Sequence, residues 1–346
     1  MRAKSHAKKG DLAEAEKLYE TILQNLSNNI RGQQGLGSLN KPIQRNVIQN
    51  PPQEEFSQLV KLYNQGQIEA VIEQAEALTA QYPGAYVVWN ILGASRAQKG
   101  MLDEALEAYK KSILLKPDFA EVYSNMGVTL KNQGKLEEAI EAYKKSIALK
   151  PNDADTFYIM GVALKDQGKL EEAIKAYKNS ISLRPNYTEV YNNLGVVFQA
   201  QGKFDEAIQV FDKAILFRSD YAEAYNNKGA LLQELGKFDE AMEALNKSIT
   251  LRPNYSDAYN NIGLTLQSKG RLDEAIKTYT KAISLKPDYA EAHQNLGLTL
   301  LNIGRLKEGL DEFEWRWKTS QFMSNERRFI QPMWDGSQSL KDKRIL

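Results

Sequence analysis

Hydrophobic and polar residues alternate along this chain with a helical period, in blocks that recur every 34 residues. In the block that starts at Ala120, apolar or small side chains mark one helical face at Tyr123, Met126, Gly127 and Leu130. After Gly134 a second face follows at Leu136, Ala139, Ile140, Tyr143 and Ile147, and Pro151 ends it. Each block is therefore expected to form two helices joined by a turn.

Two rows of glycine keep the same period. The first row lies inside the first predicted helix of each block: Gly93, Gly127, Gly161, Gly195, Gly229, Gly263 and Gly297. The second row lies between the helices: Gly66, Gly100, Gly134, Gly168, Gly202, Gly236, Gly270 and Gly304. Glycine inside a helix costs about 1 kcal/mol relative to alanine, so its recurrence predicts a closely packed partner helix. Glycine in the second row suits a left-handed turn.

A single helix pair cannot bury its apolar face alone, so the pairs must stack on one another. The spacing Trp89-x-x-Leu92-Gly93, followed by Ala105-x-x-x-Tyr109 and Pro117, resembles the tetratricopeptide repeat (TPR) family. The resemblance implies an all-α fold, a superhelical solenoid of antiparallel helix pairs. Two residues depart from the pattern: Ser219 replaces the proline of its repeat, and Gly309 replaces a small alanine.

The sequence divides into five segments. We expect partial TPR helices over 1–40, a proline-containing linker over 41–52, and a degenerate repeat over 53–85. Seven complete repeats are expected over 86–323, starting at Tyr86, Ala120, Ala154, Thr188, Ala222, Ser256 and Ala290. Residues 324–346 form a C-terminal junction.

The end of the chain differs from the repeats in its tryptophan content. Trp315, Trp317 and Trp334 are three of the four tryptophans, and Phe313–Trp317 extends the last predicted helix with aromatic residues. The segments EFEWRWKT, RRFIQPMWDG and KDKRIL resemble the junction in bacterial TPR proteins that continue into a glycosyltransferase-like domain. The resemblance implies a fragment whose catalytic domain would follow Leu346.

Charge and composition narrow the function classes. The 45 basic and 44 acidic residues give a net charge of +1, which predicts no general attraction to nucleic acid or anionic membranes. The chain has no cysteine, which excludes disulfides and thiolate chemistry and suits a reducing compartment. No apolar segment is long enough to span a bilayer, and no signal peptide is evident. We expect a cytoplasmic protein without cofactors.

No catalytic or metal-binding constellation is predicted. His293 stands where other repeats carry an aromatic residue, which favours a packing role, and His6 lies near the terminus. Acidic pairs such as Glu137–Glu138 recur in the first turn of each second helix, which favours capping and solubility over acid/base catalysis. The chain by itself is therefore expected not to be an enzyme.

A row of asparagines is the strongest candidate site. It consists of Asn125, Asn193, Asn227, Asn261 and Asn295, two residues before the helix glycines, and is interrupted by Ile91 and Ile159. Next to it lie Asn90, Asn192, Asn226 and Asn260, and one turn further on Val128, Val162, Val196, Ala230, Leu264 and Leu298. The row resembles the asparagine ladder of O-GlcNAc transferase, and the TPR resemblance implies that it lines a concave groove.

An asparagine amide donates and accepts hydrogen bonds at once, which matches the backbone of an extended peptide. Asparagine is also a common TPR consensus residue at this position, so a purely structural role stays open. Five contacts at about 1 kcal/mol each give roughly 5 kcal/mol, whereas association costs on the order of 4–15 kcal/mol. Binding is therefore expected to be weak and sequence-tolerant, with the apolar strip supplying the surplus.

Three functions follow from these patterns. The first is a scaffold that binds extended protein segments in the groove. The second is the substrate-recruiting arm of a glycosyltransferase similar to O-GlcNAc transferase. The third is self-assembly through the terminal repeats. A chaperone adaptor of the carboxylate-clamp type is disfavoured. TPR proteins of that type use a lysine beside the asparagine and a further asparagine one turn on. In this chain the first of these positions holds Asn192, Asn226 and Asn260, and the second holds Val196, Ala230 and Leu264.

Overall fold

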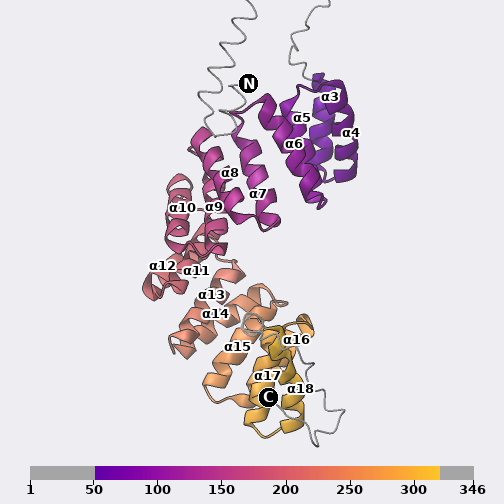
Figure 1. The fold of residues 1–346 in the computed structure, drawn as a ribbon. Helices are drawn as coiled ribbons and strands as arrows, with labels where there is room; N and C mark the ends of the chain where they lie inside the picture. Colours follow the sequence, from indigo (N-terminus) through magenta and orange to yellow (C-terminus); the bar gives the residue numbers. More distant parts are fainter. Residues whose placement is uncertain (1–50, 320–346) are drawn as a thin grey trace, which may run out of the picture. The chain divides into compact units, whose positions relative to one another are not determined.

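The computed structural model describes residues 51–319. These residues form sixteen α-helices and one 3-10 helix, and they contain no strand (Figure 1). The predicted elements in 1–40, in 41–50 and in 324–346 lie outside the described residues, and the proposed segment boundaries stay predictions. The prediction of an all-α solenoid of helix pairs is confirmed.

The helices form pairs, of which the first member has about 13 residues and the second 14 in each internal unit. The first helices are α3 (Gln53–Asn64), α5 (Tyr86–Gln98), α7 (Ala120–Asn132), α9 (Ala154–Asp166), α11 (Thr188–Ala200), α13 (Ala222–Glu234), α15 (Ser256–Ser268) and α17 (Ala290–Asn302). The second helices are α4 (Ile68–Gln81), α6 (Leu102–Leu115), α8 (Leu136–Leu149), α10 (Leu170–Leu183), α12 (Phe204–Phe217), α14 (Phe238–Leu251), α16 (Leu272–Leu285) and α18 (Leu306–Phe313).

Glycine fixes both the turn and the packing of each pair. The turn glycines adopt a left-handed conformation, with φ +76° at Gly134, where other residues are strained. Inside the first helix, a Cβ added at Gly161 would lie 2.5 Å from the ring of Tyr177. In most units the helix glycine thus lies directly against a buried aromatic ring of the second helix, and at Gly229 the side chain of Leu245 takes the place of the ring. Both predicted roles of glycine are confirmed.

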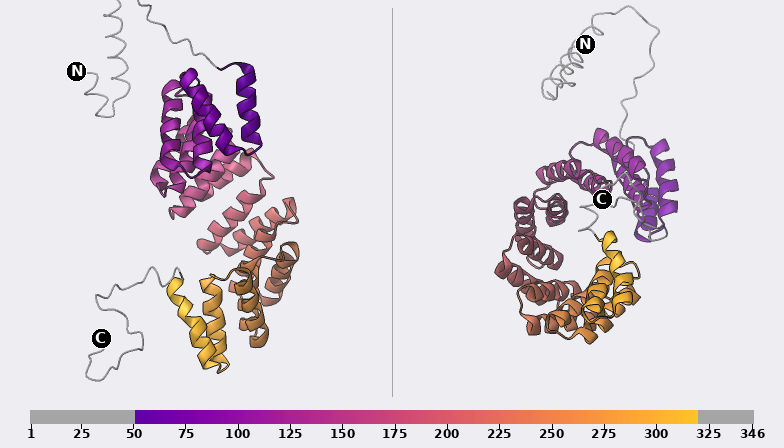
Figure 2. Two further views of the ribbon diagram at one scale, coloured as in Figure 1. Left: turned by 90° about the vertical axis from the view of Figure 1, so that its right-hand side faces the viewer. Right: turned by 60° about the horizontal axis from the view of Figure 1, so that its bottom comes forward.

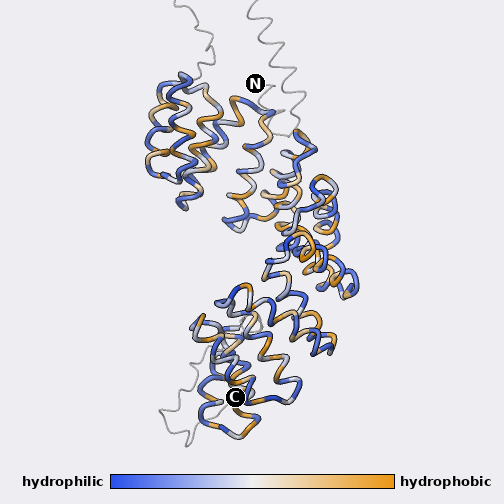
Figure 3. Tube along the Cα trace, turned by 180° about the vertical axis from the view of Figure 1, so that it is seen from behind, coloured by the Kyte–Doolittle hydropathy of each residue, from blue (hydrophilic) through white to orange (hydrophobic). Residues whose placement is uncertain are grey.

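The core repeats the same apolar contacts in successive pairs. Hydrophobic and hydrophilic stretches alternate within the helices, as amphipathic packing requires (Figure 3). Tyr109, Tyr143, Tyr177 and Tyr279 are at most 1% exposed. The second helix is tied to the first by a buried serine, as when Ser180 Oγ donates to the Ala154 carbonyl at 2.8 Å.

The last pair differs from the others. The helix α18 ends at Phe313 and is followed by the 3-10 helix η1 (Glu314–Lys318). The aromatic extension was expected to continue the α-helix, and it forms a 3-10 helix instead. At Gly297 an added Cβ would meet the backbone of Phe313 at 2.6 Å instead of an aromatic ring. The backbone therefore approaches more closely here than in the other units, which Gly309 permits by replacing the usual alanine.

Candidate functional site in the row of first helices

Contacts between units place the first helices in a continuous row. Each first helix from α5 to α15 contacts the next first helix as well as its own partner, whereas no comparable contact joins consecutive second helices in residues 51–319. Successive pairs follow one another in chain order in both views of Figure 2. We call the side on which the first helices meet the inner face. The predicted asparagine row lies there.

The asparagines bind one another between units. The donor is the Nδ2 of the predicted row and the acceptor is the Oδ1 of the adjacent asparagine in the preceding unit. The four pairs are Asn125 to Asn90 at 3.1 Å, Asn227 to Asn192 at 3.0 Å, Asn261 to Asn226 at 2.9 Å and Asn295 to Asn260 at 3.0 Å. The structure thus brings the two predicted sets together.

The acceptor asparagines are more deeply buried than the donor asparagines. Asn192, Asn226 and Asn260 are 5–8% exposed, so their carbonyl oxygens lie between the units. The donor asparagines stay half-buried. Since each amide nitrogen carries two N–H groups and uses one in the pair, a second N–H remains for other acceptors. The bond to the preceding unit fixes the orientation of each donor amide, and so the direction of its second N–H group.

Two of these pairs are connected into a longer chain of hydrogen bonds. Asn226 Nδ2 also donates to Asn227 Oδ1 at 3.3 Å, within the same helix. The resulting chain runs from Asn261 through Asn226 and Asn227 to Asn192, across three units. Amides joined in this way polarise one another, which strengthens each bond.

Asn193 is the exception in the row. Its Nδ2 donates to the Glu189 carbonyl at 3.0 Å and to the hydroxyl of Tyr158 at 3.3 Å. Tyr158 occupies the position at which other units carry the acceptor asparagine. The predicted site did not include Tyr158. Its position, 34 residues before Asn192, was the signal in the sequence that could have identified it.

The predicted apolar strip follows the asparagines along the inner face. Val128 is 37% exposed and Leu298 is 41% exposed, while Val162, Val196, Ala230 and Leu264 are half-buried. Exposed aliphatic side chains on a helix that is otherwise packed leave apolar surface for a partner. The strip and the amides therefore lie on one side of the helix row.

Charged pairs border the row at the start of the first helices. Arg184 binds Asp155 through two hydrogen bonds of 2.9 and 2.7 Å, and its guanidinium lies 4.4 Å from the centre of the Tyr187 ring. The hydrogen bonds from Arg184 lower the pKa of Asp155. The next two units repeat the arrangement as Arg218 with Glu189 and Tyr221, and as Arg252 with Glu223 and Tyr255. These side chains neutralise one another.

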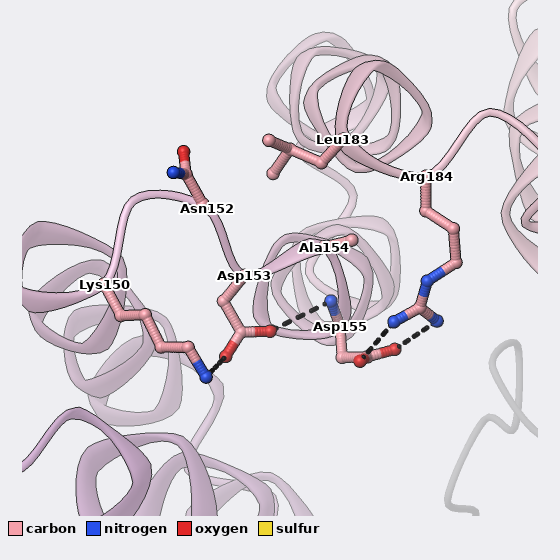
Figure 4. Close-up of a pocket in the computed structure, with 7 residues that line it drawn as sticks. All are labelled: Lys150, Asn152, Asp153, Ala154, Asp155, Leu183 and Arg184. Atoms are coloured by element: carbon pink, nitrogen blue, oxygen red, sulfur yellow. Dashed lines mark hydrogen bonds and ion pairs between the residues drawn. The ribbon is translucent and has the colours of Figure 1, made fainter.

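A polar depression lies at the loop between α8 and α9 (Figure 4). Asp153 caps α9 by accepting from the backbone N–H groups of Asp155 and Thr156 at 3.1 and 3.2 Å, and Lys150 pairs with it at 3.5 Å. Arg184 binds Asp155 at the opposite wall. Because the charged groups that line it are paired with one another, the depression offers a ligand little unmatched charge.

The aromatic position of the first helix has a polar role as well as a packing role. Tyr123, Tyr191 and the Trp89 nitrogen each donate to the carbonyl of the residue six positions earlier at 3.0 Å. His293 is buried, as expected, and its Nε2 makes the equivalent contact with the Pro287 carbonyl. Its Nδ1 contacts a carboxylate oxygen of Glu312, and its ring stacks on Trp315 at 4.0 Å. His293 thus anchors η1.

One ion pair between units, formed by Lys228 and Asp212, was not predicted from the sequence. Lys228 stands where other units have a leucine, an isoleucine or a methionine, and Asp212 stands where the two flanking units have a lysine and an asparagine. The Lys228 Nζ lies 2.6 Å from Asp212 Oδ1, between α12 and α13. The exchange of both residues keeps the contact between these units favourable.

Within residues 51–319, none of the helices combines the length and the apolar character that crossing a bilayer requires. The same residues contain no cluster of three or more histidine, cysteine or acidic side chains arranged to hold a metal ion.

Solved structures share the fold at low sequence identity. The APC/C hetero-tetramer Cut9–Hcn1 matches with a TM-score of 0.58 at 22% identity, over 70% of this chain and 48% of the other. A tetratricopeptide repeat protein from Parabacteroides merdae ATCC 43184 matches with a TM-score of 0.58 at 18% identity, over 71% and 98%. PilF of Pseudomonas aeruginosa gives 0.53 at 19%, over 60% and 95%. This chain thus spans about half of the Cut9–Hcn1 chain that it matches.

A comparison with curated proteins found no match. Family models do match. A TPR repeat model covers residues 93–134, 129–168, 161–202 and 265–304, and two tetratricopeptide repeat models cover 186–254 and 244–277. Together these matches span residues 93 to 304 without a gap, which is more than half of the 346 residues. With the packing of its helix pairs, this places the chain in the tetratricopeptide repeat family.

Proposed function

We propose that this chain binds an extended polypeptide segment along its inner face. Its TPR repeats support a protein-interaction scaffold, and the groove-binding mode is our inference from the inner-face geometry. The observation that carries the proposal is the oriented row of half-buried amides, Asn227, Asn261 and Asn295, beside an aliphatic strip that is half-buried in its middle and exposed at its two ends. Such a surface meets both needs of an extended peptide: partners for the backbone and contacts for the side chains.

The pairing of the asparagines favours this function because it removes freedom before the partner arrives. A free surface asparagine must be immobilised on binding, which costs about 0.5–1.5 kcal/mol for a side chain with many rotamers. Here the neighbouring unit already holds each donor amide, and its second N–H and the remaining lone pairs of its oxygen point away from the bond already made. The row can therefore bind a backbone at a lower entropic cost than isolated asparagines can.

The energetics predict a weak complex. Hydrogen bonds at about 1 kcal/mol each do not exceed the cost of association by themselves, so burial of aliphatic side chains must supply the rest. A buried Val or Leu contributes about 1.5–3 kcal/mol. We expect micromolar affinity and a partner that tolerates changes in sequence.

Fluorescence anisotropy with a library of labelled extended peptides tests the proposal on the full chain. The variant that replaces Asn125, Asn193, Asn227, Asn261 and Asn295 with alanine should bind at least tenfold more weakly than the wild type. Asn246→Ala, an exposed asparagine on α14, is the matched control and should bind like the wild type.

Circular dichroism must show that the five-residue variant stays helical. Leu298→Ser, at a 41% exposed position, is the second variant, because it removes apolar surface without opening the core. Equal binding by the wild type and both variants would remove the inner face from the mechanism.

A second candidate function is the substrate-recruiting arm of a larger glycosyltransferase. It is favoured by the end face of the last described unit, where Leu306 is 64% and Leu310 is 55% exposed. The residues of internal units that are equivalent to Leu310 are buried or half-buried, as when Leu106 is 7% and Ile140 is 4% exposed, and those equivalent to Leu306 are half-buried. An element later in the chain would cover this face. Sequencing the gene beyond codon 346 tests this candidate, and an immediate stop codon would contradict it.

A further inference from the structure

The amide row is not uniform along the inner face. Two consecutive steps, from α7 to α9 and from α9 to α11, lack the asparagine pair that the flanking steps have. At the first step Ser124 and Ile159 occupy the two positions, and at the second step Tyr158 and Asn193 occupy them. In place of an amide bond, Thr156 Oγ1 donates to Ser124 Oγ at 3.3 Å.

Several apolar side chains gather at this interruption. Tyr158, Ile159, Val162 and Val196 are half-buried and pack on the same core cluster, and Val128 beside them is 37% exposed. We call these five residues the apolar segment. Tyr158 is held in place by the amide of Asn193, by the Tyr187 ring at 5.2 Å and by the Tyr177 ring at 6.2 Å. Ile159 carries no polar side-chain atom, so it cannot bind a peptide backbone.

The spacing of the helices shows how many residues of an extended peptide would lie along the apolar segment. Packed helices lie about 8–10 Å apart, and an extended chain rises about 3.3 Å per residue, so one unit matches roughly three residues of peptide. The two altered steps therefore span about six residues of a bound chain. The amide pairs from α11 to α17 follow directly, over three steps.

We propose that the apolar segment sets the specificity of the groove. The preferred partner is an extended peptide with one or two bulky aliphatic or aromatic side chains at one end and small or polar residues along the rest. The bulky side chains contact Val128, Ile159 and Tyr158, while the remaining backbone follows the paired amides. This inference rests on the proposed peptide-binding function and adds the chemical class of its partner.

The test uses fluorescence anisotropy with the full chain and three labelled twelve-residue peptides. The reference contains only serine, threonine and glycine. The second and third carry two leucines, spaced two residues apart, near the amino or the carboxyl end. We expect one leucine peptide to bind wild type at least tenfold more tightly than the reference, as burial of one leucine side chain implies.

The discriminating variant is the double change Tyr158→Asn with Ile159→Asn, which introduces the asparagines that other units carry at these positions. It should reduce the leucine preference, measured as the ratio of the two affinities, to less than threefold. Ile91→Asn makes the same change at the same repeat position in α5, outside the apolar segment, and should keep the full preference. Val128→Ser alters an exposed side chain and should reduce the preference at least threefold without affecting folding.

The outcomes separate the two claims. If the wild type binds all three peptides equally, the proposed function stands and the specificity inference is wrong. If the preference survives in both the double variant and Val128→Ser, the apolar segment is not its source. If no peptide binds the wild type, both the proposed function and this inference are overturned.

Discussion

The contact between the two helices of one unit and the contact between neighbouring units are built from different chemistry. Within a unit, an aromatic ring lies on a glycine and a buried serine bonds a backbone carbonyl, as at Gly161, Tyr177 and Ser180. Between units, the inner face is joined by side-chain amides, as in the pair of Asn227 and Asn192. The first contact is almost the same in most units, whereas the second varies from step to step.

The difference shows where fold and function reside. Contacts within a unit leave little room for variation because a bulky side chain of the second helix lies directly against the glycine, as Tyr177 does at Gly161 and Leu245 does at Gly229, so they specify the fold. Contacts between units tolerate asparagine, serine, isoleucine and tyrosine at the same two positions. Variation at those positions changes the surface that a partner meets without changing the helix pair. We therefore place recognition at the junctions between units.

The largest effect on stability should come from raising the pH, because high pH ionises the tyrosines that are buried within the units. Burial raises the pKa of Tyr109 to about 12, and burial also raises the pKa values of Tyr143, Tyr177 and Tyr279. Below pH 10 these groups are protonated in the folded and unfolded chain, so pH has no effect there. Between pH 10 and 12 only the unfolded tyrosines ionise, and each one lowers the free energy of unfolding by about 1.4 kcal/mol per pH unit.

Guanidinium unfolding midpoints measured between pH 8 and pH 11.5 test this prediction. The midpoint should stay level to about pH 10 and then fall steeply. A midpoint that declines evenly across the whole range would contradict the role assigned to the buried rings.

The next largest effect should come from Gly161→Ala. The added Cβ would lie 2.5 Å from the Tyr177 ring, and overpacking of this kind costs about 1–3 kcal/mol. We expect the upper part of that range, because Tyr177 is fully buried and its ring cannot move away. Gly168→Ala has open space around it and only its positive φ to strain, so it should cost about 1 kcal/mol. Equal losses in the two variants would mean that ring and glycine are not a close fit.

A smaller loss should follow from Asn227→Ala, at the contact between units. This change leaves the buried carbonyl of Asn192 without its donor, and an unsatisfied buried polar group costs about 1–3 kcal/mol. We expect about 1 kcal/mol, because Asn192 is not fully enclosed. Thermal unfolding measures the effect, and the exposed Asn246→Ala should change stability by less than about 0.5 kcal/mol.

The smallest effect, with the opposite sign, is expected for Tyr177→Phe. The buried hydroxyl of Tyr177 has no hydrogen-bond partner among residues 51–319, and Phe211 fills the same position of the next unit against Gly195. The variant should therefore be as stable as the wild type or up to about 1 kcal/mol more stable. Tyr279→Phe is the matched opposite, because its hydroxyl donates to Gln267 at 2.8 Å, and it should lose about 1 kcal/mol.

The sequence predicted the contacts within units better than those between them. The period of 34 residues located both glycine rows, and the close approach at Gly161 followed from its cost inside a helix. Both effects are local, because they depend on residues that share one helix pair. The all-α solenoid could be predicted for the same reason, since one pair implies the next.

The pairing of asparagines could not be predicted in this way. A bond such as that between Asn261 and Asn226 depends on the rotation of one unit against the next, which the period alone does not set. The row was expected to line a groove, with a purely structural role left open, and the structure shows that one N–H of each donor in the four pairs is already used. The exchange at Lys228 and Asp212 was missed because the two residues lie in different units.

The most direct test of the account observes the donor amides themselves. Full-length protein with 15N-labelled asparagine would be titrated with the tightest-binding peptide, and the side-chain amide resonances of Asn227, Asn261 and Asn295 would be followed by NMR. We predict saturable shifts at these three residues and none at Asn246 on α14. Unchanged resonances along the row, with shifts only on the second helices, would contradict binding at the inner face.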